Sequence, residues 1–582
     1  MPSIPEVHIA GTSCLLCRQP PIAGSHVFDL EQNLLSVLDC QRPCDGCSYK
    51  PYPSAWCHPP CYSVLADSYH GSEEPTIEEF ERLAVAIRPV YMSVNKTCQE
   101  IASTLEGLLS DQTKHIILMT MIAECIAPCW YLTVLGETRR LIEYLRTNHD
   151  TQSPQLSLTR QLWISKINYQ GISYVARLSS KPLQQTGASY HMRLPSNIRR
   201  MVLSVDDIGL RRIQFVDHDT DPVPDGSPWY EILEVDCPDL KACVNCDGLF
   251  VRDIRFVDGS SSSRGIWSTP FPPKFHPWNF FHLGVKPRLD YVKFDLHIRG
   301  LLVCCCDAKT IGIHGFLNTG GLFKHFVELM RQRARTGYVH WIYFPLNRHE
   351  RIGTAWIRKP KGCSATSFGS ILILQTSLRR TVTFGPQIPA AIIDFYEYIP
   401  LVQDGDGAIS GIFHDGLDPV SRYVSAFGVT CNTQRQAGTL RLLPMDTHYE
   451  LPEVPPGKGS IATTWYMTKA SLKGLVKVQV CRDQGQSHQP CLGLLLSYSD
   501  EHMESLGQVR WDLDLTQEVL HPVYIEKVTI EGQDYIKDIR SDTLDFNESR
   551  AATGEVQKLP RDGTIIWWSG RVGDKILTCN ET

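Results

Sequence analysis

The pattern of apolar and polar residues changes character twice along the 582-residue chain. Residues 1–65 contain Pro and Gly throughout and few long apolar runs, a composition typical of turns and not of a hydrophobic core. From Thr76 the spacing becomes helical, and Glu79 follows Thr76 by three residues, as in a capping box. We therefore predict a helical segment over residues 76–148.

After residue 158 the pattern changes to short alternating runs separated by Gly, Pro, Asp and Ser, which predicts β-strands. A polar, proline-rich stretch at residues 446–460 divides this half into β-rich regions at 158–445 and 460–582. Residues 352–385 and 473–508 share one pattern: an alternating strand, a loop containing a cysteine, a Leu-rich strand, a short polar turn and a return strand that ends in Gly. Either a duplicated β unit or a convergent hairpin pattern explains this likeness.

One stretch, residues 116–135, is apolar enough to raise the question of a membrane span. A single charge, Glu124, lies in its middle, and Pro128 would interrupt a helix there. Both residues are costly in lipid, so we expect a buried pair of helices and no membrane span.

Composition and charge narrow the classes of function. The chain is 42% hydrophobic and 21% charged, with a formal net charge of -6, which argues against a protein whose main task is binding nucleic-acid phosphates. Its first residues lack the basic start and apolar stretch of a secretion signal, so we expect an intracellular protein, cytoplasmic or nuclear. No sequence motif of a known catalytic site is present, and we expect no enzyme activity.

The cysteines are unevenly distributed: seven of the 21 lie within the first 61 residues. In a protein that is not secreted, such clustering favours metal ligands over disulfides. Zinc is usually held by four Cys or His ligands that arrive as two close pairs. We predict a structural zinc site formed by two such pairs, and a second site from the remaining thiols. The first set is Cys14, Cys17, His58 and Cys61; the second is Cys40, Cys44, Cys47 and Cys57. The alternative is that these thiols are free and pack as small apolar side chains.

The whole chain resembles a set of uncharacterised fungal proteins with a cysteine-rich head and a long β-rich tail, through segments such as "APCWYLTVLGETRRLIEYL" and "CLGLLLSYSDEHMESLGQVRW". Within it, residues 104–145 are similar in layout to a degenerate F-box. That resemblance implies short packed helices that dock a ubiquitin-ligase adaptor.

A third resemblance lies in the β-rich half. The segment "ISGIFHDGLDPVSRYVSAFGV", residues 409–429, looks like the strand, glycine loop and strand with which jacalin-type β-prism lectins hold a sugar. The resemblance implies that Gly416 and Asp418 would hydrogen-bond sugar hydroxyls.

Together these features predict a multidomain α+β protein. Its parts would be a small zinc-stapled module at 1–65, an F-box-like helical segment at 76–148, and a large, mainly antiparallel β region of β-prism or sandwich-like repeats. The function that fits best is a non-enzymatic interaction protein with a protein partner, of the ubiquitin-ligase adaptor type. The alternative is a carbohydrate-binding, jacalin-like lectin. Neither reading involves nucleic acid or a membrane.

Overall fold

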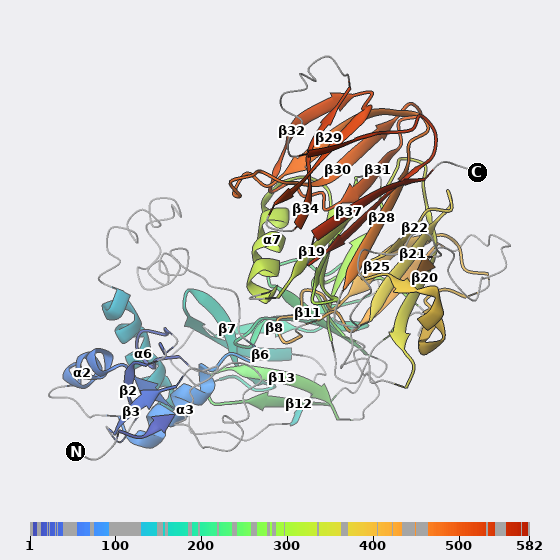
Figure 1. Ribbon diagram of the computed structural model, residues 1–582. Coiled ribbons are helices and arrows are strands. Elements are labelled where there is room, and N and C mark those ends of the chain that lie inside the picture. Colours follow the sequence, from blue (N-terminus) through green and yellow to red (C-terminus); the bar gives the residue numbers. More distant parts are fainter. Residues whose placement is uncertain are drawn as a thin grey trace. The chain divides into compact units, whose positions relative to one another are not determined.

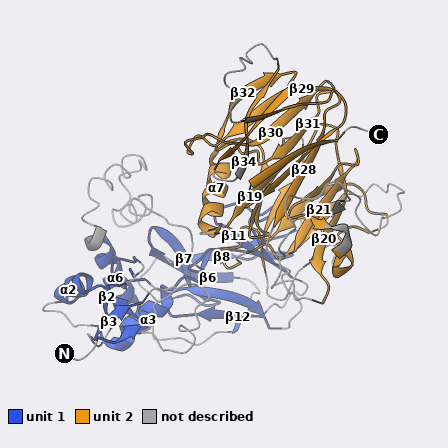
Figure 2. Cartoon of the chain, viewed as in Figure 1, with its two compact units in different colours: residues 1–271 blue, residues 272–582 orange. Residues whose placement is uncertain are grey.

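The protein is described by a computed structural model, and most of the described chain is β-strand, with four α-helices among the described residues (Figure 1). The described residues are 4–7, 13–19, 21–22, 24–29, 31, 33–38, 55–69, 75–91, 130–147, 155–157, 161–183, 189–195, 198–217, 220–235, 241–257, 265–275, 280–281, 287–295, 297–334, 337–362, 370–403, 405–421, 423–432, 448–449, 464–530, 533–541, 554–571 and 573–579. The chain divides into two compact units, residues 1–271 and 272–582, coloured separately in Figure 2. This division lies inside the range 158–445 that the sequence pattern treats as one region; the finer domain limits stay predictions.

Unit 1 begins with a small sheet in the order β1-β3-β2-β4, in which β1 and β3 run parallel and the other pairs are antiparallel. Its strands are β1 (Glu6–Val7), β2 (His26–Asp29), β3 (Leu34–Val37) and β4 (Trp56–Cys57). Three helices follow: α2 (Pro59–Asp67), α3 (Ile77–Ala86) and α6 (Trp130–Thr147). The predicted capping box is confirmed at the start of α3, where Thr76 accepts from the Glu79 amide and Glu79 accepts from the Thr76 amide.

The rest of unit 1 consists of antiparallel strands in the orders β7-β6-β8, β13-β12-β5 and β10-β9-β11-β14. These strands are β5 (Gln155–Ser157), β6 (Gln161–Tyr169), β7 (Ile172–Ser179), β8 (Ser189–Arg193), β9 (Arg200–Val205), β10 (Leu210–Val216), β11 (Trp229–Glu234), β12 (Lys241–Cys246), β13 (Val251–Phe256) and β14 (Ile266–Trp267). Most of the first core of this unit comes from the N-terminal sheet, the three helices and the facing parts of β6 and β7. The cysteine-rich head therefore shares one core with the helical segment.

Unit 2 is also built almost entirely from antiparallel strands, in the orders β16-β25-β26-β15, β18-β17-β19, β22-β21-β20-β24, β28-β36-β37 and β32-β29-β30-β34-β33-β35, with β31 on β30. Only the short pair β23–β27 is parallel among the described strands of this unit. Helix α7 (Gly321–Ala334) packs on β18, and a short 3₁₀ helix covers Ala390–Phe395. The strands are β15 (Phe280–Phe281), β16 (Arg288–Lys293), β17 (Gly300–Cys306), β18 (Lys309–Phe316), β19 (Val339–Pro345), β20 (Ile352–Pro360), β21 (Ile371–Thr376), β22 (Thr381–Thr383), β23 (Ile388–Pro389), β24 (Tyr396–Pro400), β25 (Ile409–His414), β26 (Phe427–Cys431), β27 (His448–Tyr449), β28 (Trp465–Ser471), β29 (Leu475–Arg482), β30 (Cys491–Tyr498), β31 (Met503–Gly507), β32 (Asp514–Leu520), β33 (Tyr524–Ile530), β34 (Gln533–Arg540), β35 (Gly554–Lys558), β36 (Thr564–Gly570) and β37 (Gly573–Cys579).

The two related stretches of sequence form the same local arrangement. Residues 352–385 give the antiparallel series β20-β21-β22, and residues 473–508 give β29-β30-β31. The shared pattern is thus a three-stranded meander in both places. Duplication and convergence remain alternative explanations.

The mainly antiparallel β architecture predicted from sequence is confirmed, and the β-prism or sandwich reading stays a prediction. Most of the F-box-like stretch and of the apolar segment lies outside the described residues; α6 covers the last part of each. Among the described helices, none is both long and apolar enough to cross a membrane.

Candidate metal centre

The first ligand pair lies on a tight turn that backbone hydrogen bonds close. The amide of Cys14 donates to Gln19 O over 2.9 Å, and the amide of Arg18 donates to Cys14 O over 3.0 Å. Arg18 takes a left-handed conformation with φ of 61°, which bends the chain after Cys17. The amide of Leu15 donates to Trp56 O over 2.9 Å and so ties the turn to β4. The turn therefore holds its two thiols next to the start of α2.

The second pair lies at the first turn of α2. His58 is the N-cap residue, and Pro59 and Pro60 occupy the first two helical positions. Proline is favoured at the start of a helix because its fixed φ matches the helical value. Its lack of an N–H costs nothing there, because an N–H at this position would have no acceptor within the helix. Cys61 follows His58 by three residues, a spacing that brings both side chains to the same face of the helix. The indole of Trp56 packs edge-on against the His58 ring, with 5.1 Å between ring centroids.

These two pairs converge. The ligand atoms of Cys14, Cys17, His58 and Cys61 all lie within 4.8 Å of one another. The Nδ1 atom of His58 lies 3.4 Å from Cys17 Sγ and 4.0 Å from Cys61 Sγ. A tetrahedral zinc ion, with bonds of about 2.3 Å to sulfur and 2.0–2.1 Å to nitrogen, separates such atoms by about 3.5 Å. The cluster therefore has dimensions that suit a metal ion with four protein ligands.

The electrostatics of the cluster centre on Cys14. Hydrogen bonds from Cys17, and then from Cys57 and Cys61, hold the pKa of Cys14 far below its usual range. The hydrogen bonds that Cys17 and Cys61 make to Cys14 raise the pKa of Cys17 to about 11 and raise the pKa of Cys61 even more. The Cys14 thiolate also raises the pKa of His58. One thiolate is thus shared among neighbouring thiols, and a divalent cation would allow the other thiols to ionise as ligands.

The first predicted set of ligands is therefore brought together in space. Of the second set, Cys40, Cys44 and Cys47 lie outside the described residues. Cys57 is buried in β4 opposite Phe28 and close to Cys14, but it does not belong to the four-residue group. A second zinc site thus remains a prediction.

Arg18 is a supporting residue that the sequence reasoning missed. Its guanidinium donates to Leu15 O within the turn and to Thr138 Oγ1 of α6 over 3.0 Å, and it lies 5.8 Å from the ring centroid of Tyr169. These contacts fasten the metal-binding turn to a helix and a strand far away in sequence. The residue-type pattern around Arg18 carries no signal of them.

The sugar-binding residues suggested by the lectin resemblance follow β25. Both carboxylate oxygens of Asp418 accept backbone amides: Oδ2 accepts from the amide of Arg288 over 3.0 Å, and Oδ1 accepts from the amide of Val420 over 2.9 Å. The Asp418 side chain is largely buried. The amide of Gly416 donates to His414 Nδ1 over 3.0 Å, and its carbonyl accepts from Arg333 over 2.6 Å. Both residues thus serve hydrogen bonds inside unit 2.

Comparison of the chain with profiles of known protein families gives no match, and comparison with curated proteins gives none either. The geometry defines a Cys₃His group, with three buried thiols and a half-buried imidazole, that could hold a metal ion.

Proposed function

We propose that the protein is a non-enzymatic interaction protein whose N-terminal part folds around one structural zinc ion. The observation that carries this proposal is the convergence of Cys14, Cys17, His58 and Cys61 within 4.8 Å. Three thiolates and an imidazole suit zinc, and four protein ligands leave no open position for a substrate or an activated water. An ion held in this way stabilises structure and has no catalytic role.

The need for such an ion follows from the local structure. The N-terminal sheet consists of strands of two to four residues, which bury little apolar surface on their own. A structural zinc ion contributes on the order of 10 kcal/mol to the folding of small modules. None of the described cysteines forms a disulfide, which fits a reducing compartment such as the cytoplasm or nucleus.

The partner part of the proposal rests on the helical segment and the β region. The metal ligands share a core with α3 and α6, so the ion would also hold the helices that resemble an F-box. In this proposal the helices dock a ubiquitin-ligase adaptor and the β-rich region recognises a further protein. The internal hydrogen bonds of Asp418 favour this function over the lectin alternative, because a sugar would have to compete with them.

Metal content per chain tests the zinc proposal. We expect the purified full chain to carry zinc, and Cys14→Ser and Cys61→Ser each to lose one equivalent as measured by plasma mass spectrometry. The exposed thiol Cys243 provides the control, because Cys243→Ser should leave the zinc content unchanged. Equal zinc in all four proteins would contradict the site.

Binding to a ubiquitin-ligase adaptor subunit tests the partner proposal separately. We expect the purified chain to bind such a subunit in a pull-down, and Cys14→Ser to weaken the binding because the helices lose their support. A chain that carries zinc but does not bind would refute the adaptor function and leave the metal site intact.

A further inference from the structure

Arg358 in β20 is a buried cation that has no counterion. The residue is only 2% exposed. Its guanidinium donates from Nη2 to Pro386 O, and its Cζ lies 5.6 Å from the ring centroid of Tyr396. In the part of the chain that the structure describes, Nε and Nη1 have no hydrogen-bond partner and no carboxylate forms an ion pair with Arg358. Burial lowers the pKa of Arg358, and a buried charge is costly unless a group of opposite charge pairs with it.

Two further donors share one face of the sheet β22-β21-β20-β24 with Arg358. Tyr398 lies opposite Arg358 in the register of β24 and β20, and Trp356 precedes Arg358 by two positions, so all three side chains point to one side. The indole Nε1 of Trp356 and the hydroxyl of Tyr398 are buried and make no hydrogen bond to any described residue. An indole N–H and a guanidinium can only donate. This set of groups therefore lacks acceptor oxygens, which a bound molecule would supply.

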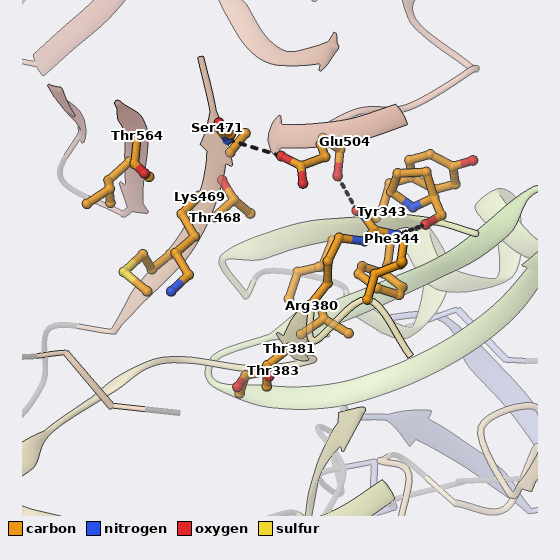
Figure 3. Close-up of a pocket in the computed structure, with 18 of the residues that line it drawn as sticks. Tyr343, Phe344, Arg380, Thr381, Thr383, Thr468, Lys469, Ser471, Glu504 and Thr564 are labelled. Carbon is orange, nitrogen blue, oxygen red and sulfur yellow. Dashed lines mark hydrogen bonds between the residues drawn. The ribbon is translucent and has the colours of Figure 1, made fainter. Parts of the chain in front are cut away.

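The same face of the sheet meets a cleft of about 410 Å³ within unit 2, which Figure 3 shows in close-up. Thr383 lines the cleft, and the registers of β22 with β21 and of β21 with β20 place its side chain on the same face as Trp356. Gln387 also lines the cleft, and it directly follows Pro386, whose carbonyl accepts from Arg358. The cleft therefore offers a route toward the guanidinium.

The acidic end of the cleft is remote from this route. The Gln387 amide donates to Trp465 O at the start of β28, whereas Glu504 accepts from the Ser471 amide at the end of β28. These two ends of the strand are about 20 Å apart. Figure 3 accordingly shows Thr383 and Glu504 on opposite sides of the cleft. The charge of Glu504 is thus far from the end of the cleft that adjoins Arg358.

We propose that Arg358 binds the carboxylate of a small molecule that has an aromatic or apolar body. The guanidinium would pair with the carboxylate, Trp356 Nε1 and the Tyr398 hydroxyl would donate to its oxygens, and the aromatic rings beside them would contact the body. One carboxylate neutralises the single charge of Arg358, whereas a phosphoryl group, with about 1.5 to 2 negative charges, would leave an excess. The molecule would enter from the cleft and displace the side chain of Gln387. The proposal stands independently of the zinc site and of the partner function.

Calorimetric titration of the full chain tests the proposal, with benzoate and inorganic phosphate as separate probes at constant ionic strength. We expect saturable binding of benzoate and none of phosphate. Arg358→Met keeps an apolar side chain of similar reach but removes the charge. It should raise the dissociation constant for benzoate at least tenfold, because hydrogen bonds to a buried charge are lost. Arg358→Lys keeps the charge without the planar fork and should raise it by a smaller factor.

Arg351→Met is the matched control, because Arg351 is exposed just before β20 and does not line the cleft. It should bind benzoate as the wild type does. Without benzoate, Arg358→Met should unfold at or above the wild-type temperature, because an uncompensated buried charge is gone, so its loss of binding reports on the site and not on the fold. Absence of saturable benzoate binding, or binding that Arg358→Met leaves unchanged, would overturn the proposal. Saturable binding of phosphate in place of benzoate would overturn the assignment of a carboxylate ligand.

Discussion

At the scale of single residues, two buried histidines in unit 2 are neutral because water cannot reach them. His340 stacks on Tyr466 with 3.9 Å between ring centroids, and neither of its ring nitrogens has a partner among the described residues. Burial lowers the pKa of His340 to about 3. His414 accepts the Gly416 amide at Nδ1, and burial lowers its pKa to about 4. A proton on either ring would be a buried charge, and at His414 the Asp290 carboxylate on the neighbouring strand offsets only part of the cost.

Because the pKa values of these two histidines are lowered in the folded protein, we expect its stability to fall in mild acid. An unfolded histidine takes up a proton near pH 6.5, whereas the folded pKa values lie well below that. The stabilisation is therefore complete above about pH 6.5 and falls as the pH drops toward 4, by on the order of 1.4 kcal/mol per pH unit for each histidine. Urea denaturation of the full chain at pH 7, 6 and 5 measures this slope.

His340→Phe isolates one of the two contributions, because phenylalanine keeps the stacking on Tyr466 and cannot take up a proton. We expect the loss of stability between pH 7 and 5 to be smaller in His340→Phe than in the wild type. His349→Phe, at an exposed histidine, should show the wild-type slope. Identical slopes in all three proteins would refute the assignment.

At the scale of elements, the start of α3 shows how local sequence and tertiary contact reinforce each other. Glu79 completes the capping box with Thr76 and also binds Arg146 of α6, with 2.6 Å between Arg146 Nε and Glu79 Oε1 and 3.0 Å between Arg146 Nη2 and Oε2. The Arg146 guanidinium lowers the pKa of Glu79. One carboxylate thus caps one helix and fastens it to another.

We expect Glu79→Gln to lower the free energy of unfolding of unit 1 by about 1 kcal/mol, because glutamine can still cap α3 but loses the charge-assisted pair with Arg146. Glu78→Gln removes an exposed charge from the same first turn and should have less than half that effect. Thermal denaturation of the two variants makes the comparison, and equal losses would show that only the helix dipole is involved.

The neighbouring tryptophans of β36 provide the corresponding case in unit 2. Trp567 and Trp568 are both fully buried and pack in the core. Trp567 also donates from Nε1 to Asp574 over 3.0 Å.

We expect Trp567→Ala to lower the free energy of unfolding, measured with denaturant, by about 3–5 kcal/mol, because it leaves a cavity in the core. Leu520→Ala, at a leucine that is 59% exposed, should change stability by less than about 0.5 kcal/mol.

At the scale of the whole molecule, the sequence predicted what depends on neighbouring residues. The Cys14–Cys17 and His58–Cys61 pairs, the Thr76 cap and the strand alternation are all readable within a few positions. The division after residue 271 depends instead on which distant strands pair, and no local pattern specifies that. The cleft of about 410 Å³ within unit 2 (Figure 3) was missed for the same reason, because its walls come from residues as far apart as Ile342 and Cys579.

Loss of the metal ion should affect the two units differently. The Cys14, Cys17 and Cys61 side chains are part of one buried cluster with residues of α3, α6, β6 and β7. The main cores of unit 2 contain other residues. Removal of the ion should therefore reach the helices of unit 1 through shared packing, while the β-sheets of unit 2 keep the interactions that stabilise them.

We accordingly expect a chelator to destabilise one part of the chain selectively. Once the cation is removed, the metal–ligand bonds that join the two ligand pairs are lost and Cys17 and Cys61 take up protons, so the turn at Cys14–Cys17 and the start of α2 should separate. Hydrogen exchange of the full chain, with and without chelator, should show faster exchange in α2, α3 and β4 and unchanged exchange in β29 and β30. Cys14→Ser should exchange in the same pattern without any chelator, and readdition of zinc should restore protection in the wild type alone. Protection that is unchanged in α2, or that is lost equally in β30, would contradict a metal centre that organises unit 1.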